Sequence, residues 1–112
     1  MPEAPSVELI VCYVTCPCLE LAERLGRLCV KERLAACANI LPGMRSIYRW
    51  KEGVETADET VLLFKTRAEL LEALAARIRE LHPYELPCVM ALPIAGGDAA
   101  YLAWIEAESG IM

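Results

Sequence analysis

SIYRWKEGVETADETVLLFKT, residues 46–66, predicts one long β-hairpin with its turn near Glu52-Gly53. Residues of the first arm alternate between two faces, and Tyr48 and Trp50 share one of them. The second arm has four consecutive apolar residues at 61–64, so two point to each face of the sheet. Leaving two such side chains in water would cost about 3 to 6 kcal/mol. Both faces of this strand must therefore be covered.

Composition points to one domain, residues 1–112, with buried subunit interfaces. The length suffices for one core but not for two. Hydrophobic residues make up 56% of the chain, and the mean hydropathy is +0.35 despite a net charge of -5. Charged residues interrupt every apolar run before the roughly 18 residues that a membrane-spanning helix needs. A pI near 4.9 argues against nucleic acid as a partner, because phosphate binding needs a positive surface.

The N-terminus and the cysteines together predict a cytoplasmic protein. Residues 1–6 are expected to form a flexible lead, and they lack the basic and apolar regions of a signal peptide. The six cysteines are therefore expected to stay reduced, and none of them forms a Cys-x-x-Cys pair. Cys12, Cys29 and Cys88 are interpreted as small apolar residues of the core.

The rest of the chain predicts strands and helices around the hairpin. Pro17 suits the first position of one helix. A second helix is indicated by a capping-box pattern at 66–69, which apolar residues at helical spacing follow. The elements expected outside the hairpin are a strand at 7–14, a helix from Cys16-Pro17 to about 34, a strand that begins at 39–41 and bends at Pro42-Gly43, a helix from 66–69 that ends before His82-Pro83, a strand at 88–92, and a short helix that Asp98 caps.

This order predicts a ferredoxin-like α+β fold, the split βαβ arrangement in which two helices lie on one face of a four-stranded antiparallel sheet. Right-handed crossovers place the first and third strands at its centre. Two helices cover only one face, although the central strands are apolar on both. We therefore expect the other face to pack on further copies of the chain, in a closed ring if the contacts are head to tail.

Several stretches resemble the CutA-type divalent-cation tolerance proteins, and the match extends over nearly all of residues 7–106. The motifs that carry it are Val14-Thr15-Cys16-Pro17, Leu34-Ala35-Ala36-Cys37-Ala38-Asn39-Ile40-Leu41-Pro42-Gly43, Ser46-Ile47-Tyr48-Arg49-Trp50, Leu63-Phe64-Lys65-Thr66, His82-Pro83-Tyr84-Glu85-Leu86-Pro87, Ala91-Leu92-Pro93-Ile94 and Tyr101-Leu102-Ala103-Trp104-Ile105. The resemblance implies a ferredoxin-like subunit, a homotrimer similar to the nitrogen-regulatory PII proteins, a cytoplasmic location, and a role in tolerance to copper and other divalent ions.

The candidate metal ligands are His82, Cys16 and Cys18. Members of the family that bind copper have a cysteine where this chain has Val14 and two histidines where it has Leu81 and His82. Cys16 and Cys18 lie near a predicted helix N-terminus, which favours thiolates, and soft metals prefer thiolate ligands. The alternative for the cysteines is structural, with Cys16 capping the helix and Cys18 packing under it. Likewise, His82 could instead cap the end of the second helix with its imidazole.

Polar and aromatic residues on apolar segments form a second candidate site, a cleft between subunits. Its members are Cys37, Asn39, Tyr48, Trp50, Lys65, Tyr84 and Glu85. Lys65 ends the most apolar strand, and if buried it requires a partner such as Glu85. One interpretation is structural pairing across a subunit boundary. The other, by analogy with the effector clefts of PII-like trimers, is binding of a small anionic or metal-linked ligand.

No pattern indicates an enzyme. Cys37 and His82 lack the local signature of a nucleophile site, and Gly96-Gly97 lacks the lysine and spacing of a P-loop. The sequence therefore predicts a trimeric scaffold for cation tolerance that binds a ligand or metal, or signals, without catalysis and without a required cofactor. Copper or another divalent cation is its candidate ligand. The alternatives are a soft-metal carrier that uses Cys16 and Cys18, and an adaptor that binds another protein through the surface of the trimer.

Overall fold

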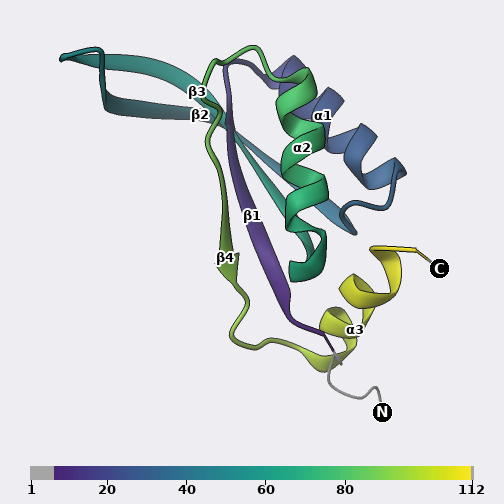
Figure 1. Ribbon diagram of the computed structural model, residues 1–112. Coiled ribbons are helices and arrows are strands. Elements are labelled where there is room, and N and C mark those ends of the chain that lie inside the picture. Colours follow the sequence, from purple (N-terminus) through teal and green to yellow (C-terminus); the bar gives the residue numbers. More distant parts are fainter. Residues whose placement is uncertain (1–6, 112) are drawn as a thin grey trace.

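The computed structural model describes residues 7–111, so the predicted lead at 1–6 lies outside the described residues. Its elements are β1 (Leu9–Cys16), α1 (Leu19–Lys31), β2 (Cys37–Trp50), β3 (Gly53–Arg67), a 3-10 turn (Ala68–Leu70), α2 (Leu71–Leu81), β4 (Val89–Pro93) and α3 (Ala99–Glu108). The strands form one antiparallel sheet in the order β2-β3-β1-β4. Figure 1 shows α1 and α2 together on one face of it. The predicted ferredoxin-like fold is confirmed, including the central position of the first and third strands.

The core lies between the sheet and these two helices, because alternate side chains of each strand point toward them. Cys12 and Val14 of β1 pair with Phe64 and Leu62 of β3, and all four side chains are fully buried. The helices add an apolar stripe that consists of Leu21, Ala22, Leu25, Cys29, Leu74 and Ile78. Each fully buried Leu or Phe contributes roughly 1.5 to 3 kcal/mol. This face of the sheet is therefore closed within one chain.

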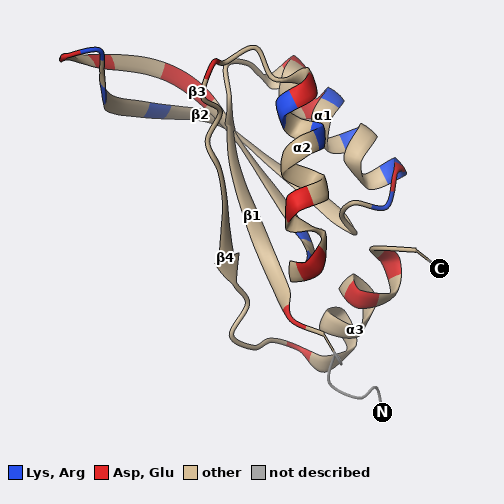
Figure 2. Ribbon diagram, viewed as in Figure 1, with Lys and Arg blue, Asp and Glu red and all other residues tan. Residues whose placement is uncertain are grey.

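The alternate residues of the same strands form the opposite side of the sheet, which we call the open face. It includes Val11, Tyr13, Leu41, Leu63, Met90 and Leu92. Leu41, Met90 and Leu92 are 54%, 50% and 48% exposed. Figure 2 shows that β1 and β4 carry no charged residues, whereas charges are frequent on the helices and the hairpin. The open face is thus apolar and partly exposed in the single chain.

β2 and β3 form the predicted long hairpin, which extends past the rest of the sheet (Figure 1). The turn lies at Lys51 and Glu52, both with positive φ (47° and 68°), one residue earlier than the sequence suggested. Two consecutive left-handed residues match the twist of a tight hairpin turn. Pairing shifts register between Leu41 and Met44, where Gly43 adopts a φ of 80°. This β-bulge confirms the predicted interruption at Pro42-Gly43.

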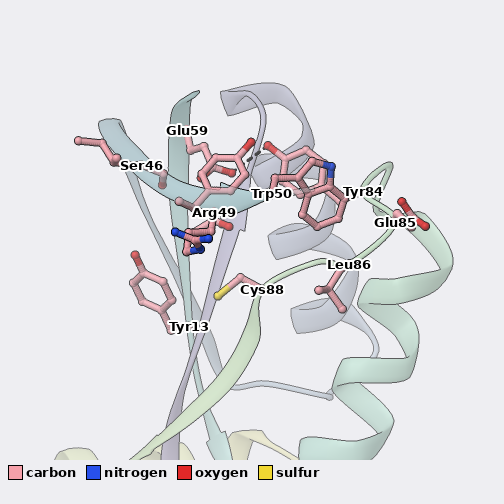
Figure 3. Close-up of a pocket in the computed structure, with 12 residues that line it drawn as sticks. Tyr13, Ser46, Arg49, Trp50, Glu59, Tyr84, Glu85, Leu86 and Cys88 are labelled. Atoms are coloured by element: carbon pink, nitrogen blue, oxygen red, sulfur yellow. Dashed lines mark hydrogen bonds between the residues drawn. The ribbon is translucent and has the colours of Figure 1, made fainter. Parts of the chain in front are cut away.

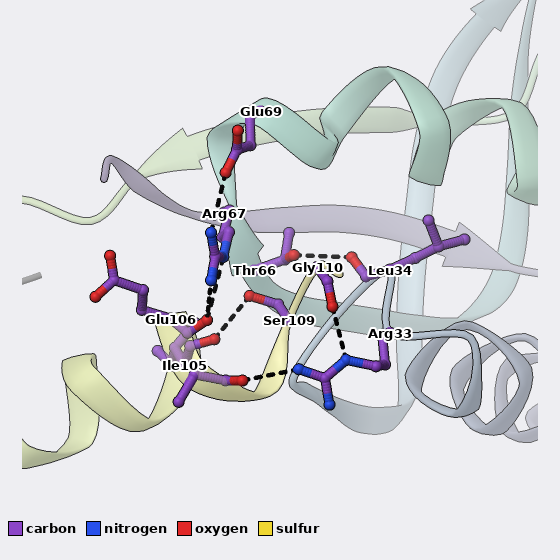
Figure 4. A network of polar contacts seen from close by, with 10 residues as sticks. Arg33, Leu34, Thr66, Arg67, Glu69, Ile105, Glu106, Ser109 and Gly110 are labelled. Atoms are coloured by element: carbon purple, nitrogen blue, oxygen red, sulfur yellow. Dashed lines mark hydrogen bonds and ion pairs between the residues drawn. The ribbon is translucent and has the colours of Figure 1, made fainter. Parts of the chain in front are cut away.

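α3 begins at a side-chain cap, because Asp98 Oδ2 accepts a hydrogen bond from the Tyr101 backbone amide at 3.1 Å. Its end is held by two arginines (Figure 4). The Arg67 guanidinium donates to the Glu106 carbonyl at 2.6 Å, and Arg33 donates to the Gly110 carbonyl at 2.6 Å. Because Ile105 packs with Leu9 and Ala36, α3 lies on the sheet of its own chain.

Three local predictions are wrong in detail. β1 continues to Cys16, which pairs with Thr60, so the strand does not end at Val14 and α1 does not start at Cys16-Pro17. The segment 66–69 forms no capping box, because Thr66 Oγ1 donates to the Leu34 carbonyl at 2.8 Å instead. α2 therefore starts only after a 3-10 turn. Tertiary pairing overrides the local signal at both helix starts.

Candidate functional site

The most developed cavity lies where the hairpin meets the segment between α2 and β4, and we call it the hairpin pocket. It has a volume of about 630 Å³. Figure 3 shows its lining residues, which are Tyr13, Thr15, Ser46, Ile47, Tyr48, Arg49, Trp50, Glu59, Tyr84, Glu85, Leu86 and Cys88. The bulge of β2 lies beside it, since Met44 pairs with Glu59 just past the shift in register. Bulges of this kind often re-aim side chains next to functional sites.

A carboxylate is buried in this pocket. Glu59 is 8% exposed, and its Oε2 accepts a hydrogen bond from the Tyr84 hydroxyl at 2.8 Å (Figure 3). Burial raises the pKa of Tyr84 well above its usual value, and the hydrogen bond to Glu59 raises it further. Tyr84 therefore stays a neutral donor. Among residues 7–111 no lysine or arginine forms an ion pair with Glu59.

His82 contacts two residues of the pocket, Thr15 and Tyr84, and although it is the C-cap residue of α2, its imidazole does not cap the helix. Its Nε2 lies 2.8 Å from the Thr15 carbonyl oxygen, and its Nδ1 accepts a hydrogen bond from the Tyr84 backbone amide at 3.2 Å. Since Nδ1 accepts, the neutral ring carries its proton on Nε2 and donates it to Thr15. The imidazole also packs against the Tyr84 ring, with centroids 4.6 Å apart. Both ring nitrogens are occupied, so a metal ion would have to displace one of these bonds.

Cys16 and Cys18 differ from both sequence interpretations. Cys16 ends β1 and is fully buried, whereas Cys18 precedes α1 at its N-cap position and is exposed, without a side-chain cap bond. Burial raises the pKa of Cys16 to about 11, and the neighbouring Cys18 and Glu59 raise it too. The expectation that the helix N-terminus favours a thiolate at Cys16 is therefore wrong. The structural alternative, with Cys16 as cap and Cys18 packed beneath, is also wrong, because Cys16 is the buried cysteine and Cys18 occupies the N-cap position without a cap bond.

The predicted cleft is divided between two places within the chain. Tyr48, Trp50, Tyr84 and Glu85 line the hairpin pocket. Cys37, Asn39 and Lys65 lie on β2 and β3 near the opposite end of the same face, where Cys37 pairs with Lys65 and its sulfur lies 3.6 Å from Asn39 Oδ1. Within one chain these two groups form no single site.

Lys65 has a different partner from the one the sequence suggested. Its Nζ donates to the Tyr101 hydroxyl of α3 at 3.1 Å, and it lies 5.2 Å from the centre of that ring. This hydrogen bond raises the pKa of Lys65. Within one chain Glu85 lines the hairpin pocket and does not reach Lys65, so the pairing across a subunit boundary stays a prediction.

Sequence reasoning named Tyr48, Trp50, Tyr84 and Glu85 but missed the other lining residues of the pocket, among them Tyr13, Glu59 and Cys88. Cys88 was assigned to the core, yet it is only partly buried and lines the pocket. Burial and the charge of Glu59 raise its pKa. Strand alternation could have indicated Glu59, because it places this carboxylate on the same face of β3 as Val61 and Leu63.

The reactive groups that line the pocket include the Glu59 carboxylate, the Cys88 thiol and the Tyr84 hydroxyl. Within residues 7–111 no group of three His, Cys, Asp or Glu side chains is close enough to hold a metal ion. Burial and the charge of Glu59 raise the pKa of the Cys88 thiol, and both ring nitrogens of His82 are engaged with backbone groups. Among the described helices none is long and apolar enough to cross a membrane.

The fold and the pocket define a class: a ferredoxin-like α+β domain with a protruding hairpin and a binding pocket at its base. The family model "CutA1 divalent ion tolerance protein" matches residues 10–108. The chain therefore belongs to the CutA1 divalent ion tolerance family, which confirms the resemblance seen in the sequence motifs.

Individual relatives agree with this assignment. The chain is similar to "Divalent-cation tolerance protein CutA" of Thermus thermophilus, with 44% identity over 89% of this chain and 97% of the relative. It is 46% identical to "Protein CutA 1, chloroplastic" of Oryza sativa over 90% of this chain but only 57% of that protein. The chain thus spans little more than half the length of that plant relative. The crystal structure of CutA1 from Oryza sativa superposes with a TM-score of 0.90 at 44% identity, covering 93% of this chain and 95% of the other.

Proposed function

We propose that this protein is a homotrimeric scaffold of divalent-cation tolerance, with copper as a candidate ion, and that it binds a ligand without catalysing a reaction. Membership of the CutA1 family supports the tolerance role. The main observation in favour of a homotrimer is the apolar, partly exposed open face of the sheet. Leu41, Met90 and Leu92 are about half exposed there, whereas Cys12, Val14, Leu62 and Phe64 on the other face of the sheet are fully buried.

The energetics favour covering this face. Burying the remaining surface of a half-exposed Leu or Met contributes on the order of 1 kcal/mol per side chain. The hairpin adds Ile47 and Val54, which are 73% and 64% exposed. A monomer rarely leaves such an apolar surface in water, and a head-to-tail ring covers the same patch in every copy. The protruding hairpin is the arm that reaches a neighbouring sheet.

We propose that copper or another divalent cation binds to the assembly and not to one chain alone. The described residues of one chain bring no three ligands together, so a metal site requires residues from more than one copy. The carrier that uses Cys16 and Cys18 loses support, because Cys16 is buried and the pKa of its thiol is raised to about 11. We place the protein in the cytoplasm, where six unpaired cysteines stay reduced.

Sedimentation of the purified protein at nanomolar concentration tests the scaffold, with and without EDTA. We expect a mass of three chains in both conditions. The double variant Met90→Glu, Leu92→Glu places charges on the open face and should dissociate the trimer. Its control is Leu19→Glu on the helical side, because Leu19 has a similar exposure of 45%. A wild-type monomer that stays folded at these concentrations would contradict the proposal.

A further inference from the structure

The C-terminal helix α3 has little apolar anchorage for its length. Ile105 is the only buried residue among its 10. It packs with Leu9 and Ala36 in a small cluster that is separate from the core between the sheet, α1 and α2. A helix of this length is not stable in water by itself, because most helical stability comes from packing. Other contacts must therefore hold α3 in place.

Two arginines from distant parts of the chain cap the end of α3. Its last turn carries Glu106 and Glu108 and no basic residue, although a helix C-terminus favours positive charge. The final carbonyl groups of a helix also have no partner within it. Here Arg67, the last residue of β3, donates to the Glu106 carbonyl at 2.6 Å, and Arg33 Nη2 donates to the Ala107 carbonyl at 2.8 Å (Figure 4). The two guanidinium groups thus supply the positive charge that α3 lacks.

Arg33 makes these contacts from a backbone conformation that glycine usually provides. Its φ is 62°, directly after the C-cap residue of α1, Glu32. A residue with a side chain is strained in this left-handed region. Arg33 Nε donates to the Gly110 carbonyl at 2.6 Å, and the Arg33 carbonyl accepts from the Gly110 amide at 2.8 Å. The contacts that offset the strain at Arg33 therefore exist only while the end of α3 is docked.

α3 in turn contacts the sheet where β2 begins. The Tyr101 hydroxyl accepts a hydrogen bond from Lys65 Nζ at 3.1 Å. Trp104 lines a groove of about 530 Å³ together with residues of α1 and with Cys37, Ala38 and Ile40 of β2, which is an edge strand. Release of α3 would therefore free Lys65 and remove one wall of this groove.

We propose that α3 is a latch that opens as a unit from the otherwise folded chain, and that the guanidinium groups of Arg33 and Arg67 keep it closed. The closed latch holds Tyr101 against Lys65 and Trp104 beside the start of β2. The main core persists when the latch opens, since it contains no buried residue of α3. All of these contacts lie within one chain, so the inference rests neither on the trimer nor on the tolerance role.

Hydrogen exchange measured by mass spectrometry tests the latch in the wild-type protein. We expect the amides of α3 to open at least about tenfold more often than the buried amides of α1, and all to the same extent. Dilution of the protein should not change this difference. Protection of α3 as strong as that of α1 would show that it opens only when the chain unfolds. Exchange that decreases gradually from the end of α3 would show simple fraying. Either result overturns the proposal.

Arg33→Asn is the decisive variant, because asparagine tolerates the left-handed region but has no guanidinium group. Its matched control is Arg79→Asn, since Arg79 is an exposed arginine of α2. We expect Arg33→Asn to speed the exchange of α3 about tenfold and that of α2 less than about twofold. The control should leave α3 unchanged. Equal exchange of α3 in the two variants overturns the proposal. If Arg33→Asn does not fold, the wild-type comparison of α3 with α1 decides.

Discussion

Replacing Tyr84 by Phe tests how strongly the buried carboxylate of the hairpin pocket is held. The substitution removes one oxygen, which donates to Glu59 Oε2 at 2.8 Å, and leaves the ring against His82. A hydrogen bond to a charged group contributes about 1.5 to 3 kcal/mol when the acceptor is buried. We expect the free energy of unfolding to fall by about 2 kcal/mol and the midpoint of thermal unfolding by roughly 8 °C.

Urea unfolding at one fixed protein concentration measures this change, since assembly makes stability depend on concentration. Tyr13→Phe is the matched control, because Tyr13 lines the same pocket and its hydroxyl has no hydrogen-bond partner among residues 7–111. It should alter the unfolding free energy by less than about 0.5 kcal/mol. The double variant Glu59→Gln, Tyr84→Phe then isolates the energy of the pair.

Spectroscopic titration provides a second readout of the same contact. Burial and the bond to Glu59 raise the pKa of Tyr84, so the wild type should show a late ionisation step above the usual range of a tyrosine. That late step should be absent in Tyr84→Phe and present in Tyr13→Phe. A loss in Tyr84→Phe no larger than in Tyr13→Phe, with the late step unchanged, would refute the reasoning.

Three further predictions concern the core and the cysteines. The free energy of unfolding should fall as pH rises above about 9, because burial raises the pKa of Cys16 to about 11 and of Cys12 to about 12, while unfolded thiols ionise near 9.0. The loss is at most about 1.4 kcal/mol per pH unit for each thiol. Urea unfolding at a series of pH values measures it, and the unfolding free energy of Cys16→Ala should decrease less steeply with pH. A thiol reagent should modify Cys18 first, as it is the exposed cysteine, and mass spectrometry after brief labelling would contradict this if Cys12 reacts equally fast. Leu62→Ala should lower the unfolding free energy by about 2 to 5 kcal/mol, because Leu62 is fully buried between sheet and helices, whereas Leu86→Ala, at 73% exposure, should change it little.

Much of the candidate site could not be predicted from sequence because its parts are distant in the chain. Tyr84 was singled out for its unusual segment, but its partner Glu59 lies 25 residues away on another strand. His82 was the only histidine, and local reasoning could offer only the end of its own helix as a partner. The actual partner is the Thr15 carbonyl, at a separation of 67 residues. Lys65 was likewise assigned to Glu85, although Tyr101 of α3 lies beside it.

Local patterns determined what depends on neighbours in sequence: the long hairpin, the order of strands and helices, the end of α2 before Pro83, the Asp98 cap, and the apolar character of both faces of β3. Only the tertiary structure decided how the residues of β2 before the bulge share a face with those after it. Before the bulge Asn39 and Leu41 point to the open face, and after it Ser46, Tyr48 and Trp50 do, because the shift in register changes the alternation by one residue. Strand pairing across the sheet sets that shift, and with it the walls of the hairpin pocket.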